Sequence, residues 1–334
     1  MRKKTGQINS TDVARAAGIS QATVSRTFSH PELVSAKTRE KVMRAAKELG
    51  YEHEAASVIE TGKGSNLVGV IVKDFQNPFY TAFVNQISQK LHRIGKQIIL
   101  FDGNSTRSID DLLKQAVSFN LGGLIIASTS LSEQLSAKKM TARIPLVLIN
   151  RQEAAHNCCS LASDDIQSSR RVADHFIDKG YRSFAFISGP EDMQSSRNRQ
   201  KGYVNRLAEW GFYNVKLAKG DYSYESGYRA MKQLLEEPAG APTAILCAND
   251  LMGLGAIDAI REVPDIRIPD DYALIGFDDI AESAWHCYGL SSMALPVSRM
   301  IDTAFEYLNT YYTDVPRCEG KHLYMCVLNE RRTG

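Results

Sequence analysis

The sequence of residues 9–26 is NSTDVARAAGISQATVSR, and its polar and small residues stand where two short helices would begin and end. Asn9 followed by Asp12 has the spacing of a helix N-cap with an acidic third position, which opens the first helix. Gly18 can adopt the left-handed conformation that closes this helix, and Ser20 can cap the second one. Two helices joined by so short a link predict a helix-turn-helix.

A third helix is expected from Ser35, because Val42, Ala45 or Ala46, and Leu49 recur on one helical face. Residues 1–50 carry ten Lys and Arg against four Asp and Glu, whereas the other 284 residues carry 30 against 34. A small three-helix unit with this positive balance is suited to binding a polyanion. A solvated charged tail would have a similar balance, but it would lack the helix caps.

The second helix has a polar face that is suited to the major groove of DNA. Its Gln can form a bidentate pair with adenine, its Ala can contact a thymine methyl group, and its Arg can bond guanine. Its hydroxyl groups can bond phosphates and set the register. An ordinary polar surface helix has a similar composition, but the charge balance favours DNA. The predicted contacts are Ser20, Gln21, Ala22, Thr23, Ser25 and Arg26.

From Leu67 onward, short apolar runs alternate with segments of helical period. The expected strands are 67–72, 97–101, 124–127, 145–149, 184–187, 215–217, 244–247 and 273–276. The expected helices are 79–94, 108–120, 131–142, 165–179, 195–210, 225–236 and 250–262. Two such series in succession predict an α/β fold with two doubly wound parallel-sheet lobes. A last helix near 297–313 and a strand over Leu323–Leu328 could belong to either lobe.

Several classes of protein are disfavoured by composition and motif. The chain is 43% hydrophobic and 23% charged, which is typical of soluble globular proteins, and no apolar run reaches the length of a membrane helix. No secretory signal opens the chain, and its six cysteines lack C-x-x-C or Cys/His metal spacing. The P-loop, G-x-S-x-G and H-E-x-x-H motifs are absent. We therefore expect a cytoplasmic protein without metal, cofactor or membrane contact, and not an enzyme.

The motifs of the head and of the body together resemble the lactose-repressor (LacI/GalR) family. In the head these are residues 12–26 and 34–42. In the body they are Asn77-Pro78-Phe79-Tyr80, Ile144-Pro145, Ile187-Ser188-Gly189-Pro190, Arg199-Gln200-Lys201-Gly202-Tyr203, Cys247-Ala248-Asn249-Asp250 and Ile275-Gly276-Phe277-Asp278-Asp279. They cover nearly the whole chain in order. The resemblance implies a homodimeric, ligand-responsive transcription regulator with a core like that of periplasmic sugar-binding proteins.

The resemblance also implies a division of the chain, in which three crossings connect the two lobes of the core. Residues 1–50 would form the helix-turn-helix domain and 51–66 the hinge or linker. Residues 67–161 with about 293–320 would form the first lobe of the effector-binding core. Residues 162–292 with about 321–334 would form the second lobe.

By the same resemblance, the effector would lie between the lobes and contact polar groups at strand ends. The implied contacts are Phe79, Tyr80, Asn150, Arg199, Tyr222, Asn249 and Asp278. Carboxylate, amide and guanidinium groups beside an aromatic face suit a sugar. A phosphorylated sugar or a purine stays open, because Arg199 and Arg151 could bind an anion. The residues also allow a structural role, with Asn249 and Asp278 as caps and Tyr222 in a core.

The hinge departs from the family pattern. His53 and Glu54 replace the usual Pro-Asn, and counting from Tyr51 places Glu60 where the family has a leucine that enters the minor groove. A carboxylate cannot serve as an apolar wedge, and a shift of one residue would place Ile59 there instead. Ile59 is therefore the predicted minor-groove contact.

The expected function is repression of a carbohydrate-use operon, released by a sugar or sugar phosphate. The expected partner is double-stranded DNA with a palindromic operator, because a twofold dimer reads an inverted repeat. The alternatives within the class are an activator and a corepressor-dependent regulator that senses a purine or another metabolite. A sugar-binding protein without a DNA role would explain the body but not the head.

Overall fold

The computed structural model describes residues 9–29, 33–49, 51, 65–72, 74–103, 118–127, 144–150, 158–236, 243–311 and 318–334. The hinge positions 53, 54, 59 and 60 lie outside these residues, as do nearly all of the helices expected at 108–120 and 131–142. None of the helices in the described ranges is both long and apolar enough to cross a membrane.

The head contains the three predicted helices, α1 (Ser10–Ala17), α2 (Gln21–Ser29) and α3 (Ala36–Leu49). Asn9 and Asp12 form a reciprocal capping box at the start of α1. Gly18 ends α1 with a φ of 63°, the left-handed conformation that glycine adopts without strain. The small core packs Val13 and Val24 against α3, so the local prediction for the head is confirmed.

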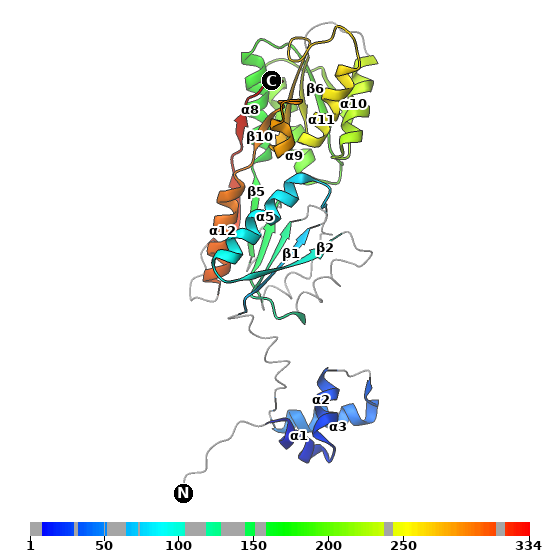
Figure 1. The fold of residues 1–334 in the computed structure, drawn as a ribbon, viewed down its shortest axis with the longest axis vertical. Coiled ribbons are helices and arrows are strands. Elements are labelled where there is room, and N and C mark those ends of the chain that lie inside the picture. The colour runs from blue at the N-terminus through cyan, green and yellow to red at the C-terminus, as the bar shows by residue number, and fades with distance from the viewer. Residues whose placement is uncertain are drawn as a thin grey trace.

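The first lobe is a six-stranded, fully parallel sheet in the order β11-β5-β4-β3-β1-β2. The strands are β1 (Leu67–Val72), β2 (Gln97–Asp102), β3 (Gly123–Ala127), β4 (Leu146–Ile149), β5 (Cys158–Ser163) and β11 (Gly320–Tyr324). Two helices, α5 (Pro78–Arg93) and α12 (Val297–Thr310), lie against each other over the sheet (Figure 1). Their apolar faces and one face of the sheet share a single core.

The second lobe is a six-stranded sheet in the order β12-β10-β9-β8-β6-β7. The strands are β6 (Ser183–Ser188), β7 (Val215–Lys219), β8 (Thr243–Cys247), β9 (Tyr272–Asp278), β10 (Ser291–Ala294) and β12 (Val327–Asn329). The helices are α8 (Asp165–Asp178), α9 (Gln194–Glu209), α10 (Tyr224–Glu236) and α11 (Asp250–Arg261), and a 3-10 turn, η2, spans Ala281–Ala284. Helix α8 packs on α9, and α10 packs on α11. Among the described strands of this sheet, β12 alone runs antiparallel to its neighbour.

The described chain passes from one lobe to the other three times: after β5, after β10 and after β11. The single strand expected over Leu323–Leu328 is wrong, because two strands occupy the tail and belong to different sheets. Tyr324 ends β11 in the first lobe, and Val327 starts β12 in the second. The second lobe therefore resumes after Tyr324 and not near residue 321. Strands β5 and β10 were not predicted, because their small and polar residues do not form an apolar run.

Candidate ligand cavity and DNA-reading helix

A cavity of about 590 Å³ lies between the lobes, where the carboxyl ends of both parallel sheets meet. Its walls come from the segments that follow β1, β4 and β5 in the first lobe and β6, β7, β8 and β9 in the second. All of the residues that the resemblance implied as effector contacts line this cavity: Phe79, Tyr80, Asn150, Arg199, Tyr222, Asn249 and Asp278. The fold thus brings together residues that are up to 199 positions apart.

Arg199 on α9 is the central charged group of the cavity. Its Nε donates to Asp165 Oδ1 at 2.9 Å, and its Nη1 donates to the Ala248 carbonyl at 2.6 Å. The same Nη1 lies 3.5 Å from Asp278 Oδ1, and the guanidinium stacks at 3.6 Å over the Phe277 ring. The Arg199 side chain is only 5% exposed. These contacts hold the guanidinium flat against the second lobe, between two carboxylates.

The carboxylates of this cluster hold their protons more tightly than carboxylates in water. Burial raises the pKa of Asp278 to about 7, although the nearby Arg199 guanidinium opposes the shift. Burial also raises the pKa of Asp165, again against the effect of Arg199. Burial acts to lower the pKa of Arg199, but the charges of Asp165 and Asp278 act in the opposite direction. The net shift is upward, so the guanidinium stays charged.

Asp165 is a cavity residue that the sequence analysis missed. It is the first residue of α8, and its Oδ1 also accepts from Ser163 Oγ at 2.7 Å. Asp164 caps the helix by accepting from Gln167 N, so the first of the two adjacent acids is structural and the second faces the cavity. The sequence feature that could have pointed to Asp165 is this Asp-Asp pair immediately after Ser163, at a crossing between the lobes.

Asn249 combines the structural and the cavity role that the sequence left as alternatives. Its Oδ1 caps α11 by accepting from Met252 N at 3.0 Å, and its Nδ2 donates to the Tyr222 carbonyl at 2.9 Å. Tyr222 has a left-handed backbone with a φ of 72°, and its hydroxyl lies 2.9 Å from Ser195 Oγ. Its ring lies against Gly189, where a Cβ would come within 2.4 Å of the ring. Tyr222 therefore packs on the core and also lines the cavity.

The first lobe contributes Phe79, Tyr80 and Asn150. Phe79 is buried, and its ring meets the Tyr80 ring edge-on at 5.3 Å. Burial raises the pKa of Tyr80, the Asn150 side chain acts against this shift, and Asn150 itself has a left-handed φ of 58°. Asn150 Oδ1 is buried and has no hydrogen-bond partner among the described residues. An unpaired buried acceptor at a cavity wall indicates a place where a ligand can donate.

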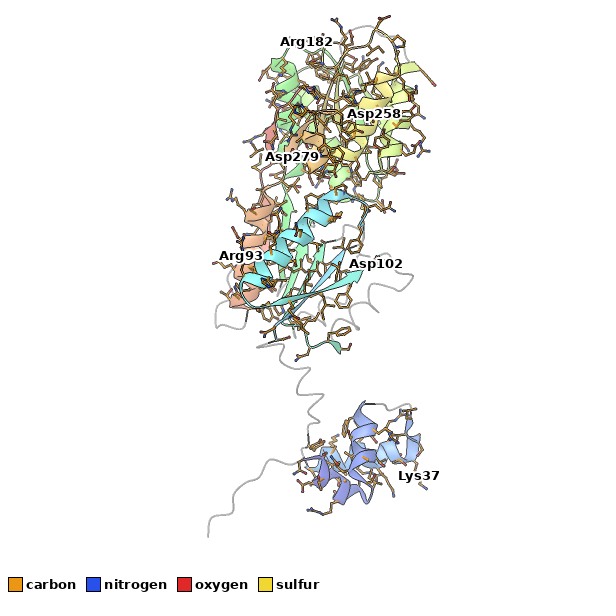
Figure 2. All side chains as sticks on the ribbon, viewed as in Figure 1. Lys37, Arg93, Asp102, Arg182, Asp258 and Asp279 are labelled. Atoms are coloured by element: carbon orange, nitrogen blue, oxygen red, sulfur yellow. The ribbon has the colours of Figure 1, made fainter. Side chains whose placement is uncertain are left out.

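The two adjacent aspartates at the end of β9 have different roles. Asp278 lines the cavity, whereas Asp279 pairs with Arg331 at 2.7 Å and accepts from Asn329 Nδ2 at 2.6 Å. Figure 2 shows Asp279 at the end of the second lobe that faces the first lobe. Asp250 is fully buried and accepts from Ile280 N and from two serine hydroxyls, so it fixes the segment after β9.

In the head, α2 presents its predicted DNA contacts with different exposures. Ser20, Gln21, Ala22 and Arg26 are exposed, whereas Thr23 and Ser25 are half-buried. Ser20 Oγ caps α2 by accepting from Thr23 N at 3.2 Å, and Gln21 Nε2 donates to Ser10 Oγ at 3.1 Å.

Within the described residues, no group of three or more His, Cys, Asp or Glu could hold a metal ion.

Comparisons with known proteins agree over both parts of the chain. The family described as bacterial regulatory proteins of the lacI family matches residues 11–53, and the periplasmic binding protein-like domain matches residues 173–333. The chain is 30% identical to the probable HTH-type transcriptional repressor ExuR of Bacillus subtilis (strain 168), over 86% of this chain and 87% of the relative. It is 31% identical to catabolite control protein A of Priestia megaterium, over 90% and 91%.

Solved structures show the same architecture. The complex of transcriptional regulator CelR with cellobiose has 27% identity and a TM-score of 0.67, and it covers 98% of this chain and 100% of the other. The Lac repressor bound to ONPG in the repressed state has 26% identity and a TM-score of 0.71, with the same coverage. The agreement therefore includes the head, both lobes and their order in the chain.

Proposed function

The chain belongs to the LacI family of bacterial regulatory proteins, and on this premise we propose that it is a dimeric repressor of carbohydrate-use genes. It is a ligand-responsive, DNA-binding transcriptional regulator and not an enzyme.

We propose that α2 of each head reads one half of a palindromic operator. The exposed side chains of Gln21, Ala22 and Arg26 supply the three kinds of base contact that discriminate adenine, thymine and guanine. Ser20 and Thr23 lie at the N-terminus of α2, where hydroxyls and backbone N–H groups favour phosphate. A single head has few base contacts, so two heads in a symmetric dimer are needed for a specific site.

We propose that the effector is a sugar or sugar phosphate bound between the lobes. The observation that supports this most directly is the set of seven implied contacts gathered on one cavity of about 590 Å³. Both aromatic side chains and hydrogen-bonding groups line it, which suits a ring with apolar faces and polar edges. Because residues of both lobes line the cavity, a bound ligand stabilises one relative orientation of the lobes.

The lobe orientation then sets the affinity for DNA. A coupling free energy of about 1–3 kcal/mol changes operator affinity by roughly 5–150-fold. If the effector releases the protein from its operator DNA, the chain is a repressor and the effector is its inducer. Tighter binding in the presence of the ligand would instead make it a corepressor-dependent regulator, which is the second candidate.

The first experiment is a thermal-shift screen of the full chain with sugars, sugar phosphates and purines. A ligand at 100 times its Kd should stabilise the folded core by about 2.7 kcal/mol. The hit is then added to an operator titration, with DNA obtained by selection from random sequence. Asp278→Asn should weaken the response, whereas Asp178→Asn, which removes an exposed carboxylate at the end of α8, should leave it unchanged. If no compound of the panel raises the melting temperature, the proposal of a carbohydrate effector is contradicted. If the footprint on the operator DNA is asymmetric, the proposal of a dimer on a palindrome is contradicted.

A further inference from the structure

We propose that Ser10, the first residue of α1, is a positioning residue that sharpens the base specificity of α2 by orienting the side-chain amide of Gln21. This role rests on the proposed function, in which Gln21 reads a base in each half of the operator. It explains what holds the glutamine amide in the one orientation that fits adenine. The observations behind it are a hydrogen bond between the two helices and the capped turn that fixes its acceptor.

The side chain of Gln21 is exposed at the start of α2, but its amide is tied to the neighbouring helix. Gln21 Nε2 donates to Ser10 Oγ at 3.1 Å, across eleven positions of sequence. The two helices that carry these residues share one core, in which Val13 of α1 and Val24 of α2 are both fully buried. Because this core fixes α1 against α2, the hydroxyl of Ser10 has a set place beside the base-reading end of α2.

The backbone around Ser10 is fixed by the capping box of α1. Asn9 Oδ1 accepts from Thr11 N at 2.9 Å and from Asp12 N at 3.2 Å, and Asp12 Oδ2 accepts from Asn9 N at 3.1 Å. These three bonds enclose Ser10, which is half-buried. A serine places its oxygen by a single torsion, so a fixed backbone leaves few positions for Ser10 Oγ. The glutamine therefore bonds to an acceptor that is itself held in place.

The bond to Ser10 leaves the groups that adenine needs. A glutamine amide has one acceptor oxygen and two N–H donors, and its bidentate pair with adenine uses the oxygen and one N–H. The second N–H is the one that Ser10 can accept. On DNA, the Ser10 hydroxyl can donate its own hydrogen to a phosphate oxygen, and it can then only accept from Gln21. This excludes the turned amide, in which the oxygen and nitrogen of Gln21 exchange places and the adenine pair is lost.

Ordering the amide before binding also reduces the loss of side-chain freedom on DNA, which is large for an unbranched glutamine. The test measures both effects as base preference. Full-length protein first selects its operator from random DNA, and Gln21→Ala identifies the base pair at which the preference depends on this side chain. Affinities are then measured for the selected operator, for the three operators changed at that base pair, and for DNA of random sequence. We expect Ser10→Ala to reduce the preference at that base pair at least threefold, and to change affinity for random DNA by less than twofold.

Three further variants separate positioning from a general effect on the head. In the Gln21→Ala background, Ser10→Ala should leave the base preference unchanged, because the side chain that it orients is gone. Ser10→Thr keeps the hydroxyl and should keep most of the preference. Thr11→Ala removes an exposed hydroxyl from the same turn and should leave the preference unchanged, and circular dichroism checks that each variant is folded.

The outcomes distinguish this role from the proposed function. An unchanged base preference in folded Ser10→Ala overturns the role of Ser10 and leaves operator reading by α2 standing. An equal loss of affinity on all DNA sequences also overturns it, because Ser10 would then act only as a phosphate contact. If Gln21→Ala changes no base preference, or if the protein selects no sequence, the base contact in the proposed function fails and the role of Ser10 fails with it.

Discussion

Arg199→Met removes the guanidinium from the centre of the cavity and keeps most of the unbranched side-chain volume. Asp165 and Asp278 then lose the positive charge that Arg199 brings to 2.9 Å and 3.5 Å. Breaking a buried ion pair by removing one partner costs about 3–5 kcal/mol. The Ala248 carbonyl also loses a donor at 2.6 Å, so we expect a cost near the upper end of that range. A domain with a stability of about 5–15 kcal/mol would lose a large fraction of it.

The assay is urea unfolding followed by tryptophan fluorescence. Trp210 and Trp285 are the two tryptophans of the chain, and both lie in the second lobe with Arg199. The fluorescence therefore reports the unfolding of the lobe that carries the substitution. The difference between wild type and variant should also depend on pH. Without Arg199 the pKa values of Asp165 and Asp278 rise further, so protonation below neutral pH relieves the penalty, and the difference should shrink from pH 8 to pH 5.

A matched control lies on the same helix. Arg206 also forms two ion pairs, with Asp174 and Glu209 at 2.7 Å each, but its side chain is 26% exposed. Arg206→Met should therefore cost only about 1 kcal/mol or less. In the Arg199→Met background, Asp165→Asn should recover part of the stability, because it removes one of the uncompensated charges. If Arg199→Met costs no more than Arg206→Met, the reasoning about the buried cluster is refuted.

Burial raises the pKa of Asp278 to about 7 and that of Asp250 to about 8, so both bind a proton more tightly in the folded protein than in the unfolded chain. Their contribution to the free energy of unfolding should therefore fall as pH rises from about 4 to about 8. When the free energy of unfolding, measured with urea, is plotted against pH, the slope should be shallower for Asp278→Asn than for wild type. Gly18→Ala should destabilise the head by about 1–2 kcal/mol, because a Cβ at a φ of 63° is strained although nothing lies within 4 Å of it; hydrogen exchange of α1 would measure this, and unchanged protection would contradict it. Gln21→Ala should cost about 1–3 kcal/mol of operator affinity at fixed salt and relax specificity at one base pair, and a uniform loss across all DNA sequences would argue against base contact.

The local structure of this protein could be predicted from short stretches of sequence. The capping box at Asn9 and Asp12 and the left-handed Gly18 depend on residues within one turn of each other, so their consequences are visible without the rest of the chain. Leu67–Val72 could be predicted as a strand because a parallel strand that is buried on both faces has a continuous run of apolar residues. The order of these elements was enough to predict two lobes.

Elements whose stability comes from distant neighbours could not be predicted in this way. Every residue of Cys158–Ser163 except Leu161 is small and polar or weakly apolar, and the segment is a strand because β4 and β11 flank it on both sides. The tail divides into β11 and β12 because the first lobe offers an edge beside β5 and the second offers an edge beside β10.

The cavity, too, could be predicted only in part from the sequence. Residue types and family motifs pointed to Arg199 and Asp278, but Asp165 and the two simultaneous roles of Asn249 emerge only when the sheets are assembled. The sequence by itself determined the helix ends, the buried strands and the chemical character of the site residues, because these follow from contacts along the chain. Only the tertiary structure decided which carboxylates share one guanidinium, since burial and charge pairing depend on groups that the three lobe crossings bring into contact.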